Sequence, residues 1–135
     1  MDPRPTASRK VLVVDDSLTV RRSAERALLA GGHEVRLAAD GFEALALIHD
    51  FAPDLVFCDI LMPRLDGYQT CAILKRHPRY AALPVVMLSS RDGVFDVARA
   101  RLAGASDHLA KPFTAEGLLE AVARHAPSGA LAQAR

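Results

Sequence analysis

The feature that most constrains the fold of this chain is a set of four short apolar runs, each followed at once by polar functional side chains. The runs and the residues that follow them are 11–14 with Asp15 and Asp16, 54–58 with Asp59, 85–88 with Ser89 and Ser90, and 107–110 with Lys111. Short apolar runs bounded in this way are typical of buried strands. The carboxyl ends of parallel strands meet at one edge of a sheet, where open α/β sheets bind their ligands. We therefore expect three carboxylates, a hydroxyl and an ammonium to share one site.

The segments between these runs have the pattern of helices, and residues 34–38 form a further, peripheral strand. Five helices are expected: from Ser17 to the glycines at 31–32, from Asp40 to the residue before Pro53, through Tyr68, Cys71, Ile73 and Leu74, through Phe95, Val97, Ala98 and Leu102, and from Thr114 to His125. Alternating strands and helices predict an α/β fold with a doubly wound, five-stranded parallel sheet. Because right-handed crossovers leave few strand orders, we expect the flavodoxin-like order 2-1-3-4-5. That order places Asp15 and Asp16 beside Asp59, at the switch point of the sheet.

The composition is that of one ordinary globular domain. The chain has 135 residues, of which 50% are hydrophobic, and a formal net charge of +1. We expect residues 10–125 to form the domain, with a flexible lead at 1–9 and a flexible tail at 126–135. No basic cluster points to a nucleic-acid partner, and no apolar run is long enough for insertion into a membrane. The two cysteines form no paired motif, which fits a reducing, cytoplasmic location.

Three carboxylates at one sheet edge repel one another unless a cation offsets their charge. An all-oxygen, carboxylate-rich site suits Mg²⁺. One carboxylate can also attack phosphorus to form an aspartyl phosphate, and Ser89 and Lys111 could then hold the phosphoryl oxygens. Simpler roles exist for single residues, since an aspartate at 15 or 16 could cap the first helix and Asp66 with Gly67 could start another. The five histidines have no metal-ligand spacing and are expected mostly at the surface.

Four motifs carry a resemblance to a known family: VLVVDDS, DILMPRLDG, VVMLSS and GASDHLAKPFT. In this order and spacing they resemble the response-regulator receiver domain of two-component signalling, over residues 10–125. The resemblance implies these roles: Asp59 as the phosphoacceptor, Asp16 as a direct Mg²⁺ ligand, Asp15 as an acidic partner acting through water, Leu61 as the source of a backbone carbonyl ligand, Ser89 as the switch hydroxyl, and Lys111, followed by Pro112 in a cis peptide, as the contact to the phosphoryl group. His108 departs from the pattern, because such domains often carry Tyr or Phe there.

The resemblance also implies a function. A histidine kinase of the chemotaxis type would supply the phosphoryl group to Asp59 in a Mg²⁺-dependent reaction, and the chain would catalyse only its own phosphorylation and dephosphorylation. A conformational change would then alter the face of the fourth helix, fifth strand and fifth helix, roughly residues 93–125, toward a downstream protein. The longer runs MPRLDGYQTCAILK and PVVMLSSRDGVFDVAR are similar to stand-alone receivers of the chemosensory system that controls type IV pili and twitching motility.

Two other functions fit the predicted fold. A Mg²⁺-dependent phosphohydrolase could use an aspartyl nucleophile, but the dehalogenase-type phosphatases carry a DxD pair after the first strand, whereas Asp15 and Asp16 are adjacent and residue 18 is Leu. A flavin carrier would need a phosphate loop rich in Ser, Thr and Gly after the first strand, and residues 16–20 do not offer one.

Overall fold

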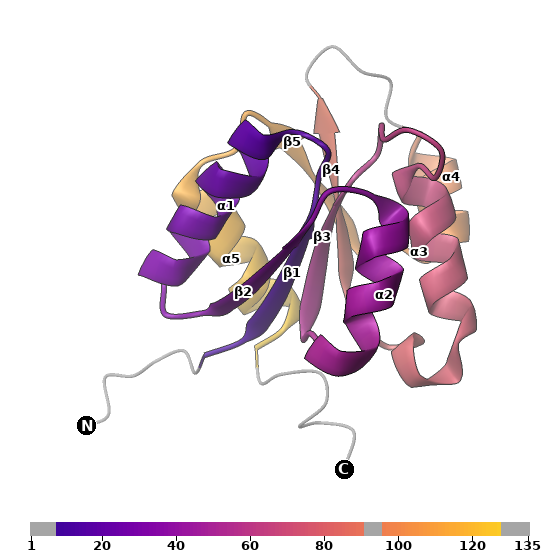
Figure 1. Ribbon diagram of the computed structural model, residues 1–135, viewed down its shortest axis with the longest axis horizontal. Helices are drawn as coiled ribbons and strands as arrows, with labels where there is room; N and C mark the ends of the chain where they lie inside the picture. Colours follow the sequence, from indigo (N-terminus) through magenta and orange to yellow (C-terminus); the bar gives the residue numbers. More distant parts are fainter. Residues whose placement is uncertain (1–7, 91–95, 128–135) are drawn as a thin grey trace.

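The chain folds around a five-stranded parallel sheet with helices on both faces (Figure 1). The computed structural model describes residues 8–90 and 96–127. The strands are β1 (Lys10–Val14), β2 (Glu34–Ala38), β3 (Leu55–Asp59), β4 (Val85–Ser90) and β5 (Asp107–Lys111). They lie in the order β2-β1-β3-β4-β5, and neighbours pair in parallel. The predicted fold class and strand order are confirmed.

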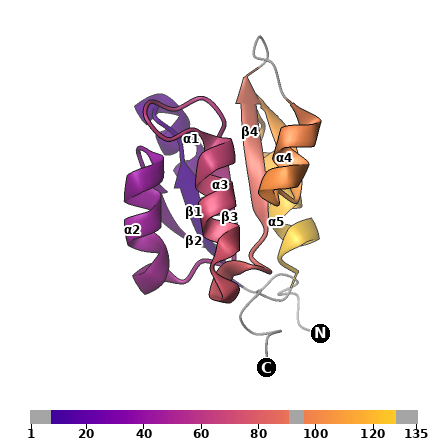
Figure 2. The same cartoon turned by 90° about the vertical axis from the view of Figure 1, so that its right-hand side faces the viewer.

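Helices α1 and α5 cover one face of the sheet, and α2, α3 and α4 cover the other (Figures 1 and 2). Their bounds are Leu18–Ala30 for α1, Gly41–Phe51 for α2, Gly67–Arg76 for α3, Val97–Ala103 for α4 and Ala115–His125 for α5. A short 3₁₀ helix, Pro78–Tyr80, follows α3 and was absent from the sequence prediction. Among the described residues, no helix has the length and apolar character needed to span a membrane.

Side chains of the central strands alternate between two hydrophobic clusters, one on each face of the sheet. On β1, Leu12 and Val14 join the cluster under α2, α3 and α4, whereas Val11 and Val13 join the cluster under α1 and α5. A strand that is covered on both faces is apolar at every position, which explains the unbroken run in the sequence. Burial of each such side chain stabilises the fold by about 1.5–3 kcal/mol. This core fixes where β1 and β3 end, and with them the side chains of the site.

Polar side chains fix where the helices begin. Ser17, Asp40 and Thr114 each accept a hydrogen bond from the backbone N–H three residues later, at 3.3, 2.8 and 2.9 Å. Asp66 and Gln69 form a reciprocal capping box at the start of α3. Such a cap stabilises a helix by about 1 kcal/mol. The predicted helix starts at these four positions are confirmed.

The short helix α4 packs through small residues rather than large ones. Phe95, which we expected in this helix, lies outside the described residues, and the helix begins at Val97. Its buried residues are Ala100 and Ala103, whereas Leu102 is 88% exposed. Val97 and Leu102, which helped to predict this helix, therefore do not form its buried face. Alanines allow the helix backbone to approach the core closely and leave the leucine outside.

Arg9 and Ala126, which the sequence prediction placed in the terminal segments, are both buried. The Arg9 guanidinium donates from Nε to the Ala126 carbonyl at 2.6 Å and from Nη2 to the Pro127 carbonyl. The backbone N–H of Arg9 donates to Nδ1 of His33 at 3.1 Å, and His33 is also buried. These contacts join the start of β1 to the end of α5, at the opposite end of the strands from the acidic residues.

Candidate functional site

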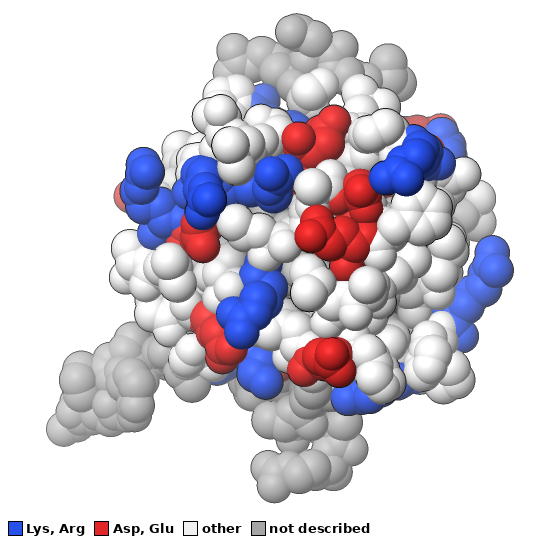
Figure 3. Space-filling view, in the orientation of Figure 1, with Lys and Arg blue, Asp and Glu red and all other residues white. Residues whose placement is uncertain are grey.

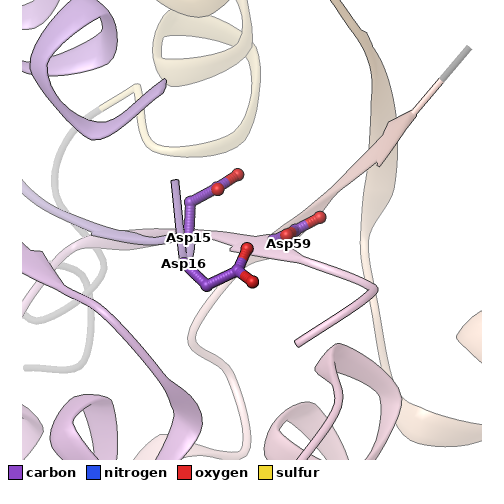
Figure 4. A group of neighbouring side chains, drawn as sticks. All are labelled: Asp15, Asp16 and Asp59. Atoms are coloured by element: carbon purple, nitrogen blue, oxygen red, sulfur yellow. The ribbon is translucent and has the colours of Figure 1, made fainter. Parts of the chain in front are cut away.

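Three carboxylates meet where β1 and β3 end. Asp15 and Asp16 directly follow β1, and Asp59 is the last residue of β3. One oxygen of each side chain lies within 4.8 Å of the others, and Figure 4 shows the three side chains side by side. Asp15 and Asp59 are buried, whereas Asp16 is exposed. Because β1 and β3 flank the switch point of the sheet, the structure brings together the three carboxylates that the sequence placed there.

Asp15 is held at both its backbone and its side chain. Its N–H donates to the Ala38 carbonyl at the end of β2 (3.1 Å), and its carbonyl accepts from Nη1 of Arg21 (2.7 Å). Its Oδ1 accepts from the Ser17 N–H at 2.9 Å, and its Oδ2 from Nζ of Lys111 at 3.1 Å. This buried carboxylate is therefore a fixed element of the site, while the exposed Asp16 faces solvent.

Lys111, at the end of β5, bridges two of the carboxylates. Its Nζ lies 3.1 Å from Oδ2 of Asp15 and 3.2 Å from Oδ1 of Asp59. Burial alone would lower the pKa of Lys111, but the hydrogen bond and charge of Asp15, with those of Asp59, raise the pKa above its ordinary value. Lys111 is therefore a permanent cation at neutral pH. The peptide bond from Lys111 to Pro112 is cis, as predicted.

The charge of Asp59 is poorly compensated. Burial, followed by the charge of Asp15, raises the pKa of Asp59 from 3.8 to about 6, and Lys111 offsets only part of this effect. Asp16 adds a smaller repulsion in the same direction. Three carboxylates thus face one bridging ammonium. An additional cation would relieve this excess of negative charge. The ligands are carboxylate oxygens, and the exposed Asp16 leaves the site open to water, which fits Mg²⁺ because this ion keeps several of its waters.

The remaining predicted residues lie on the same edge of the sheet. Asp59 pairs in register with Leu88 of β4, and the next residue of β4 is the buried Ser89. Leu61 lies in the loop between β3 and α3, two residues after Asp59, and its side chain is 65% exposed. The assigned roles of Ser89 and of the Leu61 carbonyl remain predictions.

The sequence analysis did not predict the contacts that two residues make with the site. Arg21 contacts the Asp15 carbonyl, but a basic residue on a helix is most often solvated, so its type carried no signal. Gly67 begins α3 against the backbone of Asp59, and a Cβ at Gly67 would overlap the Asp59 carbonyl oxygen. The glycine was noted only as part of a helix start. Its close approach to β3 is a further constraint on the position of Asp59.

Comparison with known proteins identifies the family. Residues 11–123 match the model of the response regulator receiver domain. The chain belongs to this family. It is 53% identical over 119 residues to protein PilG of Pseudomonas aeruginosa, covering 88% of each chain. It is 46% identical over 110 residues to the response regulator MprA of Mycobacterium sp. (strain KMS), covering 82% of this chain but only 47% of MprA.

Solved structures agree with this receiver fold. The chemotaxis protein CheY4 of Vibrio cholerae superposes with a TM-score of 0.82 at 33% identity, covering 88% of this chain and 99% of that one. The receiver domain of NtrX from Brucella abortus gives a TM-score of 0.76 at 38% identity, with coverage of 88% and 99%. The five-stranded order found here is therefore that of a receiver domain.

The receiver domain also has a hollow of about 230 Å³ between α4 and β5, at the side of the sheet. Val97 and Arg101 of α4 and Asp107 and His108 of β5 are among its lining residues. His108, which stands in place of the expected aromatic residue, is exposed. Asp107 is held by His125 of α5, with 2.9 Å between Nε2 and Oδ2. This face therefore combines apolar, basic and acidic groups around an imidazole.

Proposed function

We propose that this chain is a phosphorylation-dependent switch that accepts a phosphoryl group on Asp59 from a histidine kinase. One observation carries the proposal: in a receiver domain, Asp15, Asp16 and Asp59 converge at the switch point with Lys111 bridging two of them. We assign Mg²⁺ to this site, held by the three carboxylates and the Leu61 carbonyl. Bound Mg²⁺ would neutralise charge on the phosphoryl oxygens.

In the proposed reaction an oxygen of Asp59 attacks the phosphorus of a phosphohistidine on the kinase. A P–O bond forms, the P–N bond to the imidazole breaks, and the imidazole nitrogen takes the electron pair and then a proton. Lys111 binds Oδ1 of Asp59, which leaves Oδ2 free of this ammonium. As the carboxylate becomes an acyl phosphate, the Lys111 ammonium can transfer its hydrogen bond to a phosphoryl oxygen. Water would then hydrolyse the P–O bond of the acyl phosphate and regenerate the Asp59 carboxylate. In this proposal the domain catalyses only its own phosphorylation and dephosphorylation.

The phosphoryl group would be sensed by Ser89, which follows Leu88, the register partner of Asp59. Movement of Ser89 toward the new anion would change the face of α4, β5 and α5. The hollow beside His108 on this face supports its assignment as the contact for a downstream protein. On the face shown in Figure 3, basic side chains gather on the left, over α1, and acidic side chains gather near the middle of the face.

The pathway we propose is a cytoplasmic chemosensory system that acts on type IV pili and twitching motility, with a kinase of the chemotaxis type. Support comes from the runs MPRLDGYQTCAILK and PVVMLSSRDGVFDVAR and from the 53% identity to PilG. A Mg²⁺-dependent phosphohydrolase is the alternative, and a multiple-turnover assay on small phosphomonoesters distinguishes the two. We expect no sustained turnover.

The proposal is tested by labelling with radioactive acetyl phosphate in the presence of Mg²⁺. The wild-type chain should gain label, and Asp59→Asn should gain none. Asp50→Asn is a matched control, because Asp50 is an exposed aspartate of α2 and the substitution has the same chemistry. Equal labelling of the Asp59→Asn variant would refute the assignment of the phosphoacceptor. Undiminished labelling in EDTA would refute the role of the metal.

A further inference from the structure

Arg21 is linked to the acidic site through the protein backbone. It lies one helical turn after Ser17, the cap of α1, and its own N–H donates to the Ser17 carbonyl at 3.0 Å. Its guanidinium turns back toward the sheet, where Nη1 donates to the Asp15 carbonyl at 2.7 Å. Arg21 is partly buried in this position. A charged donor at this distance makes a strong hydrogen bond.

The Asp15 carbonyl matters because it belongs to the peptide group that joins Asp15 to Asp16. The peptide group is planar, so fixing this oxygen fixes the plane from which the Asp16 backbone departs. The Asp15 side chain is already held by Ser17 and Lys111. The Arg21 contact therefore acts on the orientation of the exposed Asp16 relative to the buried Asp15.

We propose that Arg21 is a positioning residue, which holds the peptide between Asp15 and Asp16 so that both carboxylates can bind one divalent cation with Asp59. This inference rests on the Mg²⁺ site of the proposed function. Arg21 contacts a neutral carbonyl rather than a carboxylate, so its contribution is to geometry. Without it the peptide can rotate, and part of the binding free energy of the cation is lost in re-forming the site.

The neighbouring residue offers a matched control. Arg22 is also on α1, but its side chain is 62% exposed and pairs with Glu25 at 3.1 Å. The variants Arg21→Gln and Arg22→Gln remove the same charge from adjacent positions. A general electrostatic effect of α1 on cation binding would appear in both variants. A positioning role would appear only in the first.

The experiment is a titration of each full-length variant with Mg²⁺, followed by NMR amide shifts, because the chain contains no tryptophan to report binding. We expect Arg21→Gln to raise the Kd for Mg²⁺ by on the order of tenfold. Arg22→Gln should change this Kd by less than about twofold. Arg21→Lys, which keeps a cationic donor, should restore part of the affinity. In the metal-free protein, hydrogen exchange of the Ser17 amide should be faster in Arg21→Gln than in Arg22→Gln.

The outcomes separate the two proposals. If the wild-type chain shows no saturable Mg²⁺ binding, the metal site of the proposed function fails and this inference fails with it. If the wild type binds Mg²⁺ and the two glutamine variants share one Kd, only the positioning role of Arg21 is refuted. Should Arg21→Gln not fold, Arg21→Lys decides. A Kd between those expected for wild type and for Arg21→Gln supports the positioning role, whereas a Kd and a Ser17 exchange rate equal to those of wild type would refute the need for the Arg21 guanidinium.

Discussion

Lys111 and Asp15, 96 residues apart in the chain, form an ion pair with 3.1 Å between Nζ and Oδ2, and Asp15 is fully buried there. The same ammonium contacts Asp59 at 3.2 Å. One cation thus compensates two buried carboxylates in the metal-free protein. A divalent cation bound to Asp59 and Asp15 would share that task, so the stabilising effects of Lys111 and of Mg²⁺ should depend on each other.

We expect Lys111→Met to lower the free energy of unfolding of the metal-free protein by about 3 kcal/mol, because it leaves buried carboxylates without their ammonium. Saturating Mg²⁺ should restore more stability in this variant than it adds to the wild type. The measurement is urea unfolding with EDTA and with Mg²⁺. Lys10→Met removes the same charge at an exposed position and should show neither effect. An equal gain from Mg²⁺ in wild type and Lys111→Met would contradict the shared role.

Asp59 makes the metal-free protein less stable as the pH rises. Because the pKa of Asp59 is raised from 3.8 to about 6, chiefly by burial, the folded state binds more protons than the unfolded state between these values. Stability from the protonated form is therefore lost as the pH rises through about 6. In EDTA at pH 8, Asp59→Asn should raise the free energy of unfolding by roughly 1–3 kcal/mol, and this gain should shrink toward pH 4. Urea unfolding across this pH range measures it, and a gain independent of pH would contradict the repulsion.

The fold was predictable because its signals are local. Apolar runs such as 11–14 predict strands that are covered on both faces. Helix starts are predicted by the capping residues Ser17, Asp40 and Thr114, each of which bonds to a backbone N–H only three residues later. The meeting of Asp15 and Asp16 with Asp59 followed from chain order together with the handedness of crossovers. The acidic part of the site therefore needed no knowledge of side-chain packing.

What the sequence did not reveal depends on the tertiary structure. The contact of Arg21 with the Asp15 carbonyl spans six residues, but it depends on the direction in which the guanidinium turns at the start of α1. Leu102 resembled a core residue, yet alanines form the buried face of α4. Ala126 followed a helix and preceded a segment of Pro, Ser and Gly, so composition placed it in a tail although it packs on the core. Each case concerns which neighbour a side chain meets, and periodicity carries no information on that point.

His33 should make the fold sensitive to mild acid. Its Nδ1 accepts the Arg9 N–H, and burial, with the charge of Arg9, lowers the pKa of His33 below its ordinary value. The unfolded state therefore binds the proton more readily, so stability is lost as the pH falls below about 6.5 toward the folded pKa. His33→Asn keeps an acceptor that cannot be protonated. Its stability relative to wild type, measured by urea unfolding, should rise between pH 7 and pH 5. A constant difference between wild type and His33→Asn would contradict this prediction.

Arg64 occupies a strained turn in the loop between β3 and α3. Its φ is 69°, and the Leu65 N–H donates across it to the Pro63 carbonyl at 2.7 Å, which is the pattern of the rarer γ-turn. Its Nη2 donates to Oδ2 of Asp40 at 3.0 Å, and its guanidinium lies 5.2 Å from the centre of the Phe42 ring. These contacts tie the loop after Asp59 to the start of α2, and they offset the backbone strain.

Glycine and alanine substitutions at Arg64 separate the strain from the contacts. Both lose the contacts to Asp40 and Phe42, but only glycine adopts a positive φ without steric cost. We expect Arg64→Gly to be more stable than Arg64→Ala by about 1 kcal/mol in urea unfolding. The order should reverse at Arg22, inside α1, where Arg22→Gly should be less stable than Arg22→Ala by a similar amount because glycine disfavours a helix. If alanine were the more stable replacement at both positions, the turn at Arg64 would not be strained, and its side-chain contacts alone would hold the loop.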